Sequence, residues 1–372
     1  MPELMVEAGK TLMVSGPALA MLLEGEAHIL GAPLRSGDKV TIRRWRLLPI
    51  YAVKNCRVKV ELGSEGSLAE YDGSTIPQGW WEAASRITET SKFKPLTVAV
   101  LGGIDVGKTA FTVFLANRAV VEGLKVSVVD GDVGQSDLGP PCTLGSVQLE
   151  TPIFDLFFIR PERLEFAGST TPSKVKGRLL EASKRLCAQE RERSRLVVLN
   201  TDGWILGDMA EAYKVSLVRA VRAEAIVGLQ SLGELEPILE KLEVEGLLVV
   251  RLPVSSKVKA RSRGERRELR WQAYTKYFAG ASIRSLSLHH IRVSGLMEPK
   301  PGAILALYAP PGRLLGIGIT LAYNRRREAL KILTPVKGLV GKVEIGEVLP
   351  DFASSSPLRL KPNNNLQRLL HG

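Results

Sequence analysis

Apolar residues in the first 85 positions occur in short runs, most of them separated by turns that contain glycine or proline. Residues 18–23 are the one segment that fits a short helix, and elsewhere the pattern is typical of strands. We therefore expect a small β-sandwich or barrel over residues 1–85, ending near the adjacent Trp80 and Trp81. Its expected strands include residues 12–14, 27–30, 39–42 and 56–60.

The pattern changes after residue 86, where continuous apolar runs alternate with helical ones. Residues 96–101 form an apolar run, residues 110–121 carry a helical pattern, and residues 125–129 form the next apolar run. A strand, a helix and a strand in close succession indicate a βαβ unit and a parallel sheet. We expect an α/β domain over residues 86–282, with helices on both faces of the sheet. Further strands are expected at residues 154–159, 196–199, 225–229 and 247–251.

Residues 283–372 return to short β runs and are expected to form a second small β domain. Residues 354–372 resemble a poorly anchored tail. The fold class predicted from the pattern is therefore α/β, with a parallel-sheet core flanked by two small β domains. Strands of the second β domain are expected at residues 303–308, 315–321, 329–333 and 341–348.

Charge and composition restrict the choice of partners. Lys and Arg number 51 against 39 Asp and Glu, which gives a formal net charge of +12. This excess suits a nucleic acid, although a generic basic surface would also explain it. The three cysteines and four histidines show no metal-ligand spacing, so a metal should have oxygen ligands. Neither a membrane-spanning run nor a secretory signal is apparent, and we expect a cytoplasmic or nuclear protein without membrane contact.

A phosphate-binding motif follows the first strand of the predicted α/β domain. Residues 102–109 fit the pattern GxxxxGK[ST] and lie between a predicted strand and a predicted helix, a context that argues against a chance match. In such loops the backbone N–H groups and the following helix N-terminus favour phosphate, the lysine reaches the β and γ phosphates, and the hydroxyl binds Mg²⁺. These roles fall on Lys108 and Thr109. We expect ATP or GTP to contact Gly103, Ile104, Asp105, Val106, Gly107, Lys108, Thr109 and Ala110.

Two carboxylates, Asp130 and Asp132, end the next predicted strand. One carboxylate at this place commonly holds Mg²⁺, directly or through water, and a second could accept a proton from an attacking hydroxyl. An ordinary loop that ends a strand can have the same sequence. The proximity of the phosphate-binding loop favours the catalytic interpretation, with Thr109, Asp130 and Asp132 as candidate metal ligands.

At this point the sequence resembles the polynucleotide 5′-hydroxyl kinases of RNA processing, and an archaeal-type member fits the pattern. These include kinases of pre-mRNA 3′-end cleavage, tRNA splicing and ribosomal RNA processing. The resemblance rests on four ordered blocks at residues 102–109, 130–135, 200–204 and 261–280. It implies a P-loop NTPase core, a general-base or metal-positioning role for Asp132, and an outer Mg²⁺ role for Asp130.

The resemblance also implies residues for substrate and transition-state contacts. Trp204 would stack on a substrate base, although a core tryptophan remains an alternative. Gln135 belongs to the same block as Asp132, and Thr171 falls on a clasp near the phosphates, where Lys174 departs from the expected Asn. Asp202 is another departure, at a position that is often small or Cys in the family.

Arg261 and Arg266 fall on a basic lid that would contact the transferring γ-phosphate. Arginine suits this role because its planar group donates two hydrogen bonds at once and stays charged. A solvated helix face is the alternative, but the segment is too rich in basic residues for good pairing. A basic helix predicted over residues 173–195 could contribute to a nucleic-acid track or be purely structural.

The sequence thus predicts an enzyme that transfers the γ-phosphate of ATP or GTP to the 5′-hydroxyl end of RNA, with DNA as an alternative acceptor. Lys108, Asp132, Arg261 and Arg266 are the expected catalytic residues, and Mg²⁺ the expected metal. RNA-processing proteins are candidate partners. A nucleotide-binding scaffold without turnover is the alternative function, and a switch GTPase is disfavoured because no NKxD-like element follows.

Overall fold

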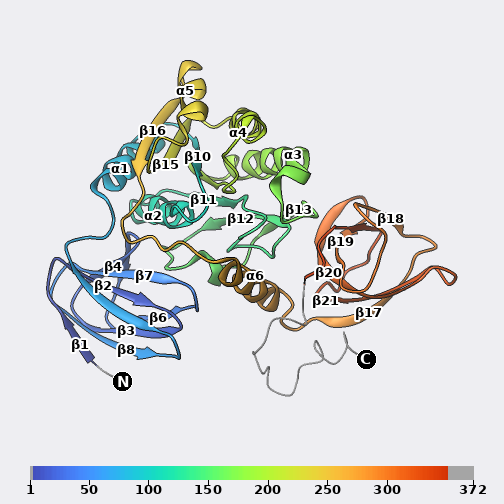
Figure 1. Ribbon diagram of the computed structural model, residues 1–372, viewed down its shortest axis with the longest axis horizontal. Helices are drawn as coiled ribbons and strands as arrows, with labels where there is room; N and C mark the ends of the chain where they lie inside the picture. Colours follow the sequence, from blue (N-terminus) through green and yellow to red (C-terminus); the bar gives the residue numbers. More distant parts are fainter. Residues whose placement is uncertain (1–2, 351–372) are drawn as a thin grey trace.

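The computed structural model describes residues 3–350, with a β domain at each end and an α/β domain between them (Figure 1). The N-terminal β domain has two antiparallel sheets, ordered β1-β8-β3-β6 and β5-β4-β7-β2-β9. Residues 18–23, which fitted a short helix, lie in strand β3, where alternate residues are buried and the period is therefore two. The strands are β1 (Glu3–Val6), β2 (Lys10–Ser15), β3 (Ala18–Glu24), β4 (Ala27–Ile29), β5 (Ala32–Leu34), β6 (Lys39–Ile42), β7 (Leu47–Ala52), β8 (Cys56–Leu62) and β9 (Ser67–Asp72).

The predicted boundary at residue 85 falls inside a helix, α1 (Gln78–Phe93). This helix packs on α2 (Lys108–Val121) through aromatic contacts, with Trp80 edge-on to Phe111 at 5.1 Å and Trp81 edge-on to Phe114 at 4.9 Å. Because α1 belongs to the α/β domain and the last N-terminal strand ends at Asp72, we place the boundary in residues 73–77.

A seven-stranded sheet forms the centre of the molecule, in the order β13-β12-β11-β14-β10-β15-β16. The pairings from β11 to β16 are parallel, and β12 and β13 are antiparallel additions at one edge. Strands β10, β11 and β14 are buried throughout, as their continuous apolar runs predict. The strands are β10 (Leu96–Gly102), β11 (Val126–Asp130), β12 (Thr143–Leu149), β13 (Arg163–Phe166), β14 (Leu196–Asn200), β15 (Ala225–Gln230) and β16 (Leu248–Pro253).

Helices cover both faces of this sheet. Helices α1 and α2 share one apolar layer with the N-terminal β domain, and α3, α4 and α5 build the layer on the opposite face. Residues 154–159, predicted as a strand, instead contain a single 3₁₀ turn, η1 (Leu156–Phe158), capped by the Asp155 side chain. The remaining helices are α3 (Pro172–Arg191), α4 (Asp208–Ala220), α5 (Glu236–Val244) and α6 (Arg263–Tyr277).

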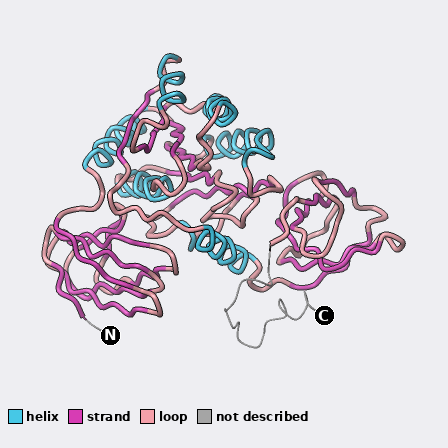
Figure 2. Tube along the Cα trace, in the orientation of Figure 1, coloured by secondary structure: helices cyan, strands magenta, loops and turns pink. Residues whose placement is uncertain are grey.

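The C-terminal β domain is a six-stranded sheet in the order β17-β21-β20-β19-β22-β18. It begins at Ser282, one residue before the predicted boundary, and the predicted tail at residues 354–372 lies outside the described residues. Figure 2 shows α6 between the two β domains in this view, apart from the helices that cover the sheet. Within residues 3–350, no helix is long and apolar enough to cross a membrane. The strands are β17 (Ser282–Ser287), β18 (Arg292–Gly295), β19 (Ile304–Ala309), β20 (Arg313–Asn324), β21 (Ala329–Thr334) and β22 (Lys342–Ile345).

Candidate active site

The phosphate-binding loop connects β10 to α2, as the motif predicts. Gly107 precedes the helix with a φ of +94°, a conformation that glycine adopts without strain. A β-carbon on Gly102 would come within 2.6 Å of Val106 Cγ2, so the start of the loop also requires glycine. Lys108 is buried and its Nζ donates to the carbonyl oxygen of Gly103 at 2.6 Å. Burial lowers the pKa of Lys108 to about 8, with Asp132 acting in the opposite direction.

Asp130, at the end of β11, is fully buried and organises the loop that follows it. Its Oδ2 accepts hydrogen bonds from Ser136 Oγ at 2.9 Å, from the N–H of Asp137 at 2.9 Å and from the N–H of Leu138 at 3.2 Å. Burial raises the pKa of Asp130, and these hydrogen bonds oppose the rise. With one oxygen occupied by three donors, Asp130 is suited to positioning the loop and to an outer role at a metal.

Asp132 presents a different arrangement, because only one of its oxygens is occupied. Its Oδ1 accepts the N–H groups of Gly134 and Gln135, each at 3.0 Å. Within residues 3–350, no group donates a hydrogen bond to Oδ2. Burial raises the pKa of Asp132 to about 6, while Lys108 lowers it and Asp202 raises it further. A half-buried carboxylate with a free oxygen and this pKa is suited to accept a proton near neutral pH.

Asn200 joins the phosphate-binding loop to Asp130. The parallel register pairs Asn200 with Asp130 on one side and with Val100 on the other. Its Nδ2 donates to Thr109 Oγ1 at 3.2 Å and to Asp130 Oδ1 at 3.0 Å, and its own Oδ1 is buried without a partner among residues 3–350.

The oxygen-rich set around Asn200 fits Mg²⁺, which prefers hydroxyl, carboxylate and carbonyl ligands. The orphaned Oδ1 of Asn200 adds a buried acceptor beside Thr109. Within residues 3–350, no group of three or more His, Cys, Asp or Glu side chains is arranged to hold a metal. The metal contacts expected from Thr109, Asp130 and Asp132 therefore remain a proposal.

The lid predicted around Arg261 and Arg266 consists of the residues just before α6 and the first turn of that helix. Ser262 and Glu265 make a reciprocal capping box there. Arg261 and Arg266 both form ion pairs with Asp105 of the phosphate-binding loop, at 2.9 and 3.1 Å. Gln135 Nε2 donates to the carbonyl oxygen of Arg266 at 3.1 Å, which ties the loop after β11 to the lid. The structure thus brings the predicted lid residues to the predicted phosphate site.

Trp204 lies at the carboxyl end of β14, stacked on Tyr213 with ring centroids 5.6 Å apart. The backbone N–H of Trp204 donates to Asp202 Oδ1 at 2.9 Å, while Asp202 Oδ2 accepts from Tyr213 Oη and pairs with Lys214, each at 3.0 Å. Trp204 is partly exposed and lines the cavity described below, while it also packs against the apolar core on that face of the sheet. A small residue or Cys was expected at position 202. The aspartate found there instead forms a buried polar network with Trp204, Tyr213 and Lys214.

A cavity of about 590 Å³ brings these groups together. Lys108, Asp132, Gln135, Arg261 and Arg266 all line it, while Asp130 lies behind its wall. Thr170 and Pro172 border the cavity, whereas Thr171, the predicted clasp residue, does not. Among the predicted substrate residues, Gln135 and Trp204 are thus placed at the cavity and Thr171 is displaced from it.

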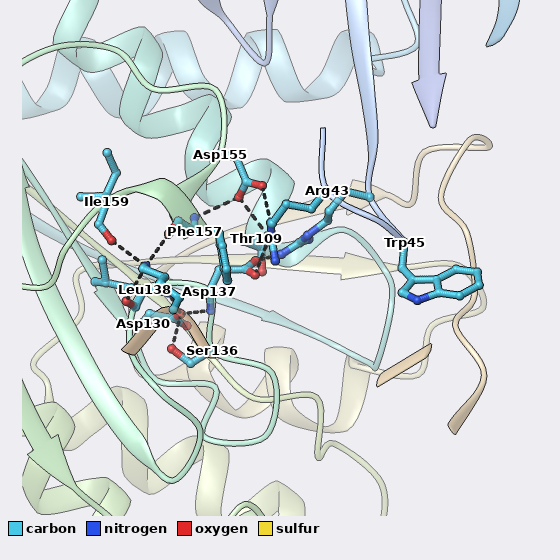
Figure 3. A network of polar contacts seen from close by, with 12 residues as sticks. Arg43, Trp45, Thr109, Asp130, Ser136, Asp137, Leu138, Asp155, Phe157 and Ile159 are labelled. Atoms are coloured by element: carbon cyan, nitrogen blue, oxygen red, sulfur yellow. Dashed lines mark hydrogen bonds and ion pairs between the residues drawn. The ribbon is translucent and has the colours of Figure 1, made fainter. Parts of the chain in front are cut away.

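One wall of the cavity comes from the N-terminal β domain, through a buried ionic network (Figure 3). Arg43 pairs with Asp137 at 3.0 Å and with Asp155 at 3.1 Å, and its guanidinium lies 3.7 Å from the centroid of the Phe157 ring. Arg46 also pairs with Asp137. These contacts reach the candidate catalytic residues because the N–H of Asp137 donates to Asp130.

The lid helix joins the same network from its other end. Lys276 Nζ donates to the carbonyl oxygens of Phe157, of Ile159 at 2.8 Å and of Leu138 at 3.4 Å. Burial lowers the pKa of Lys276 to about 8, and the positive charge of Arg43 contributes to the lowering. Lys276 thereby holds three segments together: the loop after β11, the 3₁₀ turn η1 and helix α6.

Sequence reasoning missed Asn200, Arg43, Asp137, Asp155 and Lys276. A signal existed for Asn200, which is the polar end of a buried apolar run next to the strands that carry the loop and Asp130. Arg43 contacts Asp137 and Asp155 across 94 and 112 positions of the chain, and Lys276 contacts the carbonyl oxygens of Leu138 and Phe157 across 138 and 119 positions. No local pattern indicates such pairs.

Comparison with known proteins finds similar sequences over the part of the chain that contains this site. Residues 102–280 match the family described as mRNA cleavage and polyadenylation factor CLP1 P-loop. The chain is 32% identical to a polyribonucleotide 5′-hydroxyl-kinase of Methanocaldococcus jannaschii over 225 residues, 60% of this chain and 61% of that protein. It is 31% identical to one of Pyrococcus horikoshii over 243 residues, 65% of this chain and 66% of that protein. The match therefore spans less than two thirds of the length of these archaeal relatives.

More distant relatives match over longer regions. The chain is 28% identical to Clp1 of Danio rerio over 321 residues, 80% of this chain and 69% of that protein. The structure of Clp1p in its complex with Pcf11p covers 94% of this chain and 97% of that chain, with a TM-score of 0.76 at 14% identity. This likeness confirms the predicted fold, a P-loop core flanked by β domains.

Proposed function

We propose that this chain is a kinase that phosphorylates the 5′-hydroxyl end of RNA, since residues 102–280 match the CLP1 P-loop family. The observation that carries the proposal is the shared cavity. It contains a phosphate-binding loop, a carboxylate with a free oxygen, two arginines and a partly exposed tryptophan. The archaeal and animal relatives named as polyribonucleotide 5′-hydroxyl-kinases support the same activity.

The two ends of the phosphate-binding loop suggest how the substrates are placed. A β-carbon on Gly107 would lie 3.6 Å from Trp80, on the side of the N-terminal β domain, and one on Gly103 would lie 3.5 Å from Ile205, next to Trp204. We place the base of ATP or GTP on the first side and the RNA end on the second. Trp204 stacks on a base of the RNA, a contact that tolerates every base because each has a π-face.

The transfer itself follows from the groups in the cavity. Asp132 accepts the proton of the 5′-hydroxyl while the hydroxyl oxygen bonds to the γ-phosphorus and the bond to the β–γ bridging oxygen breaks. Lys108 offsets charge on the β and γ phosphates, and Arg261 and Arg266 stabilise the charge on the moving phosphoryl group. Thr109 and Asn200, with Asp130 behind them, would hold Mg²⁺, which supplies further charge neutralisation at the phosphates. RNA-processing proteins are proposed as partners, because the related Clp1p was solved in complex with Pcf11p.

The proposal is tested by transfer of labelled γ-phosphate from ATP or GTP to 5′-hydroxyl oligonucleotides, RNA and DNA in parallel, with Mg²⁺. We expect labelled RNA with the native protein and none with Lys108→Ala. Asp132→Asn should lose at least about 10³-fold in rate while nucleotide binding is kept, because Asn still accepts the N–H groups of Gly134 and Gln135. Nucleotide binding without transfer to any acceptor would contradict the kinase function and favour a nucleotide-binding scaffold. Near-normal turnover by Asp132→Asn would remove Asp132 from the role of base.

A further inference from the structure

Asp105 lies within the phosphate-binding loop and contacts both arginines of the lid. Its carboxylate pairs with Arg261 Nη1 at 2.9 Å and with Arg266 Nη1 at 3.1 Å. It also accepts a hydrogen bond from the backbone N–H of Arg261 at 3.0 Å. Although 156 positions separate Asp105 from Arg261, one carboxylate fixes both the start of the lid and one nitrogen of each guanidinium.

A carboxylate is an unexpected group in a loop that binds phosphates, because its charge repels them. The backbone of Asp105 also has a φ of +57°, which is unfavourable for any residue with a β-carbon, although Asp and Asn tolerate it better than most. Glycine would avoid both penalties. The contacts with the two arginines supply a function for the side chain, and the arginines offset its negative charge.

The pairing leaves part of each guanidinium available. Within residues 3–350, neither Arg261 Nη2 nor the Nε and Nη2 of Arg266 has a hydrogen-bond acceptor. Arg261 is held from another side as well, because its Nε donates to the carbonyl oxygen of Trp45 at 3.4 Å. Both arginines line the cavity that also contains Lys108. Each guanidinium is therefore anchored through some of its N–H groups and keeps others for an anionic ligand.

We propose that Asp105 is a positioning residue: it docks the lid on the phosphate-binding loop and presents the unpaired N–H groups of Arg261 and Arg266 to the transferring phosphoryl group. The second half of this statement rests on the proposed kinase function. The docking itself does not, since it concerns contacts within the protein alone.

Two substitutions test the proposal in the full chain. Asp105→Gly removes the side chain and fits the backbone conformation, and Asp105→Asn tolerates the conformation but removes the charge. The readouts are hydrogen exchange of the backbone amides of residues 261–267 without nucleotide, the thermal midpoint, and the rate and KM of phosphoryl transfer. The control is Glu236→Gln, which removes a carboxylate paired with Arg251 at 3.0 Å in the same domain and outside the cavity.

If Asp105 docks the lid on the phosphate-binding loop, the lid amides of Asp105→Gly should exchange at least about tenfold faster, without a fall in the thermal midpoint. The transfer rate should fall on the order of 10²-fold, as expected when a catalytic group loses its position. The KM for ATP should not rise, because a negative charge beside the phosphates is lost. Asp105→Asn should show the same changes to a smaller extent, and Glu236→Gln none of them.

Other outcomes separate the alternatives. Unchanged exchange in both Asp105 variants would overturn the docking, and faster transfer would show that Asp105 restrains the arginines instead of positioning them. A parallel fall in thermal midpoint and nucleotide affinity would indicate a merely structural residue and overturn the proposal. Should the native protein transfer phosphate to no acceptor, the kinase function fails, and the exchange measurement still decides whether Asp105 docks the lid.

Discussion

The two β domains attach to the α/β domain in different ways. The N-terminal β domain shares a continuous apolar core with helices α1 and α2, and its Arg43 is buried between Asp137 and Asp155. The C-terminal β domain shares a smaller apolar core with Phe166 and with Tyr274 and Phe278 of the α6 region. It also contacts α3 through the more exposed pairs Lys174–Glu347 and Arg178–Glu344. Among the described residues, none of the C-terminal β domain lines the cavity.

The difference shows that similar architecture does not imply a similar role. A buried charge must be paired where it lies, so the Arg43 network fixes the N-terminal β domain against the catalytic loop. Exposed pairs contribute little to stability and allow the attached domain to vary. We infer that the N-terminal β domain is part of the proposed catalytic unit, whereas the C-terminal β domain packs beside it without reaching the cavity.

The largest effect is expected from Arg43→Met, which leaves Asp137 and Asp155 without their shared buried partner. Removal of one member of a buried pair costs about 3–5 kcal/mol in the free energy of unfolding. Burial alone would raise the pKa of Asp155, but Arg43 and Arg46 outweigh it and the pKa is lowered. The stability from this depressed pKa is present at neutral pH and is lost as the pH falls through the folded-state value. Urea unfolding of both proteins should therefore give the largest difference near pH 7 and a smaller one below about pH 4.

A difference below about 1 kcal/mol at pH 7 would contradict this prediction, because it is the range of exposed ion pairs. Phosphoryl transfer by Arg43→Met should also be impaired at temperatures where the protein remains folded. The reason is that Asp137, which donates its N–H to Asp130, would lose its anchor.

The next effect concerns two of the three tryptophans that line the cavity within the described residues. Trp45 belongs to the N-terminal β domain and Trp204 to the segment after β14. Trp204→Ala should raise the KM for the oligonucleotide about 10- to 100-fold and leave that for ATP unchanged, since stacking on one base is worth about 1–3 kcal/mol. Trp45→Ala should do the reverse if the nucleotide base lies on the side of the N-terminal β domain. The corresponding Phe variants keep an aromatic ring and serve as controls, and equal effects of both Ala variants on both KM values would contradict the assignment.

The pH dependence of kcat/KM should reveal the catalytic pair of the α/β domain. Transfer needs Asp132 deprotonated and Lys108 protonated, and burial moves their pKa values to about 6 and about 8. The rate constant should rise about tenfold per pH unit below the first value and fall above the second, a bell-shaped profile. Lys108→Arg should move the alkaline limb to higher pH, whatever it costs in rate. An alkaline limb that stays in place would assign it to another group, for which Lys276 is the candidate.

The sequence and the structure agree where function depends on neighbouring residues. The phosphate-binding loop, Asp130 and Asp132 follow apolar runs directly, so strand ends and chemistry could be predicted together. Strands β12 and β13 were missed, because antiparallel edge strands within a βαβ pattern have no distinct signal. Residues 154–159 are apolar enough for a strand, but the Asp155 side chain caps a turn there instead. The Arg43 network and the Asp105 contacts join distant segments, and charge patterns along the chain do not indicate such pairs.

The smallest effect is expected at the C-terminal β domain. Arg178→Met removes the ion pair with Glu344. The Arg178 side chain is 35% exposed, and Glu344 keeps a second ion pair with Lys342 at 3.2 Å. Water and the remaining lysine can satisfy Glu344, so the loss in unfolding free energy should stay below about 1 kcal/mol. Transfer to a short oligonucleotide should be unchanged, because neither residue lines the cavity. A loss equal to that of Arg43→Met would show that both β domains are built into the catalytic unit and would remove the distinction between them.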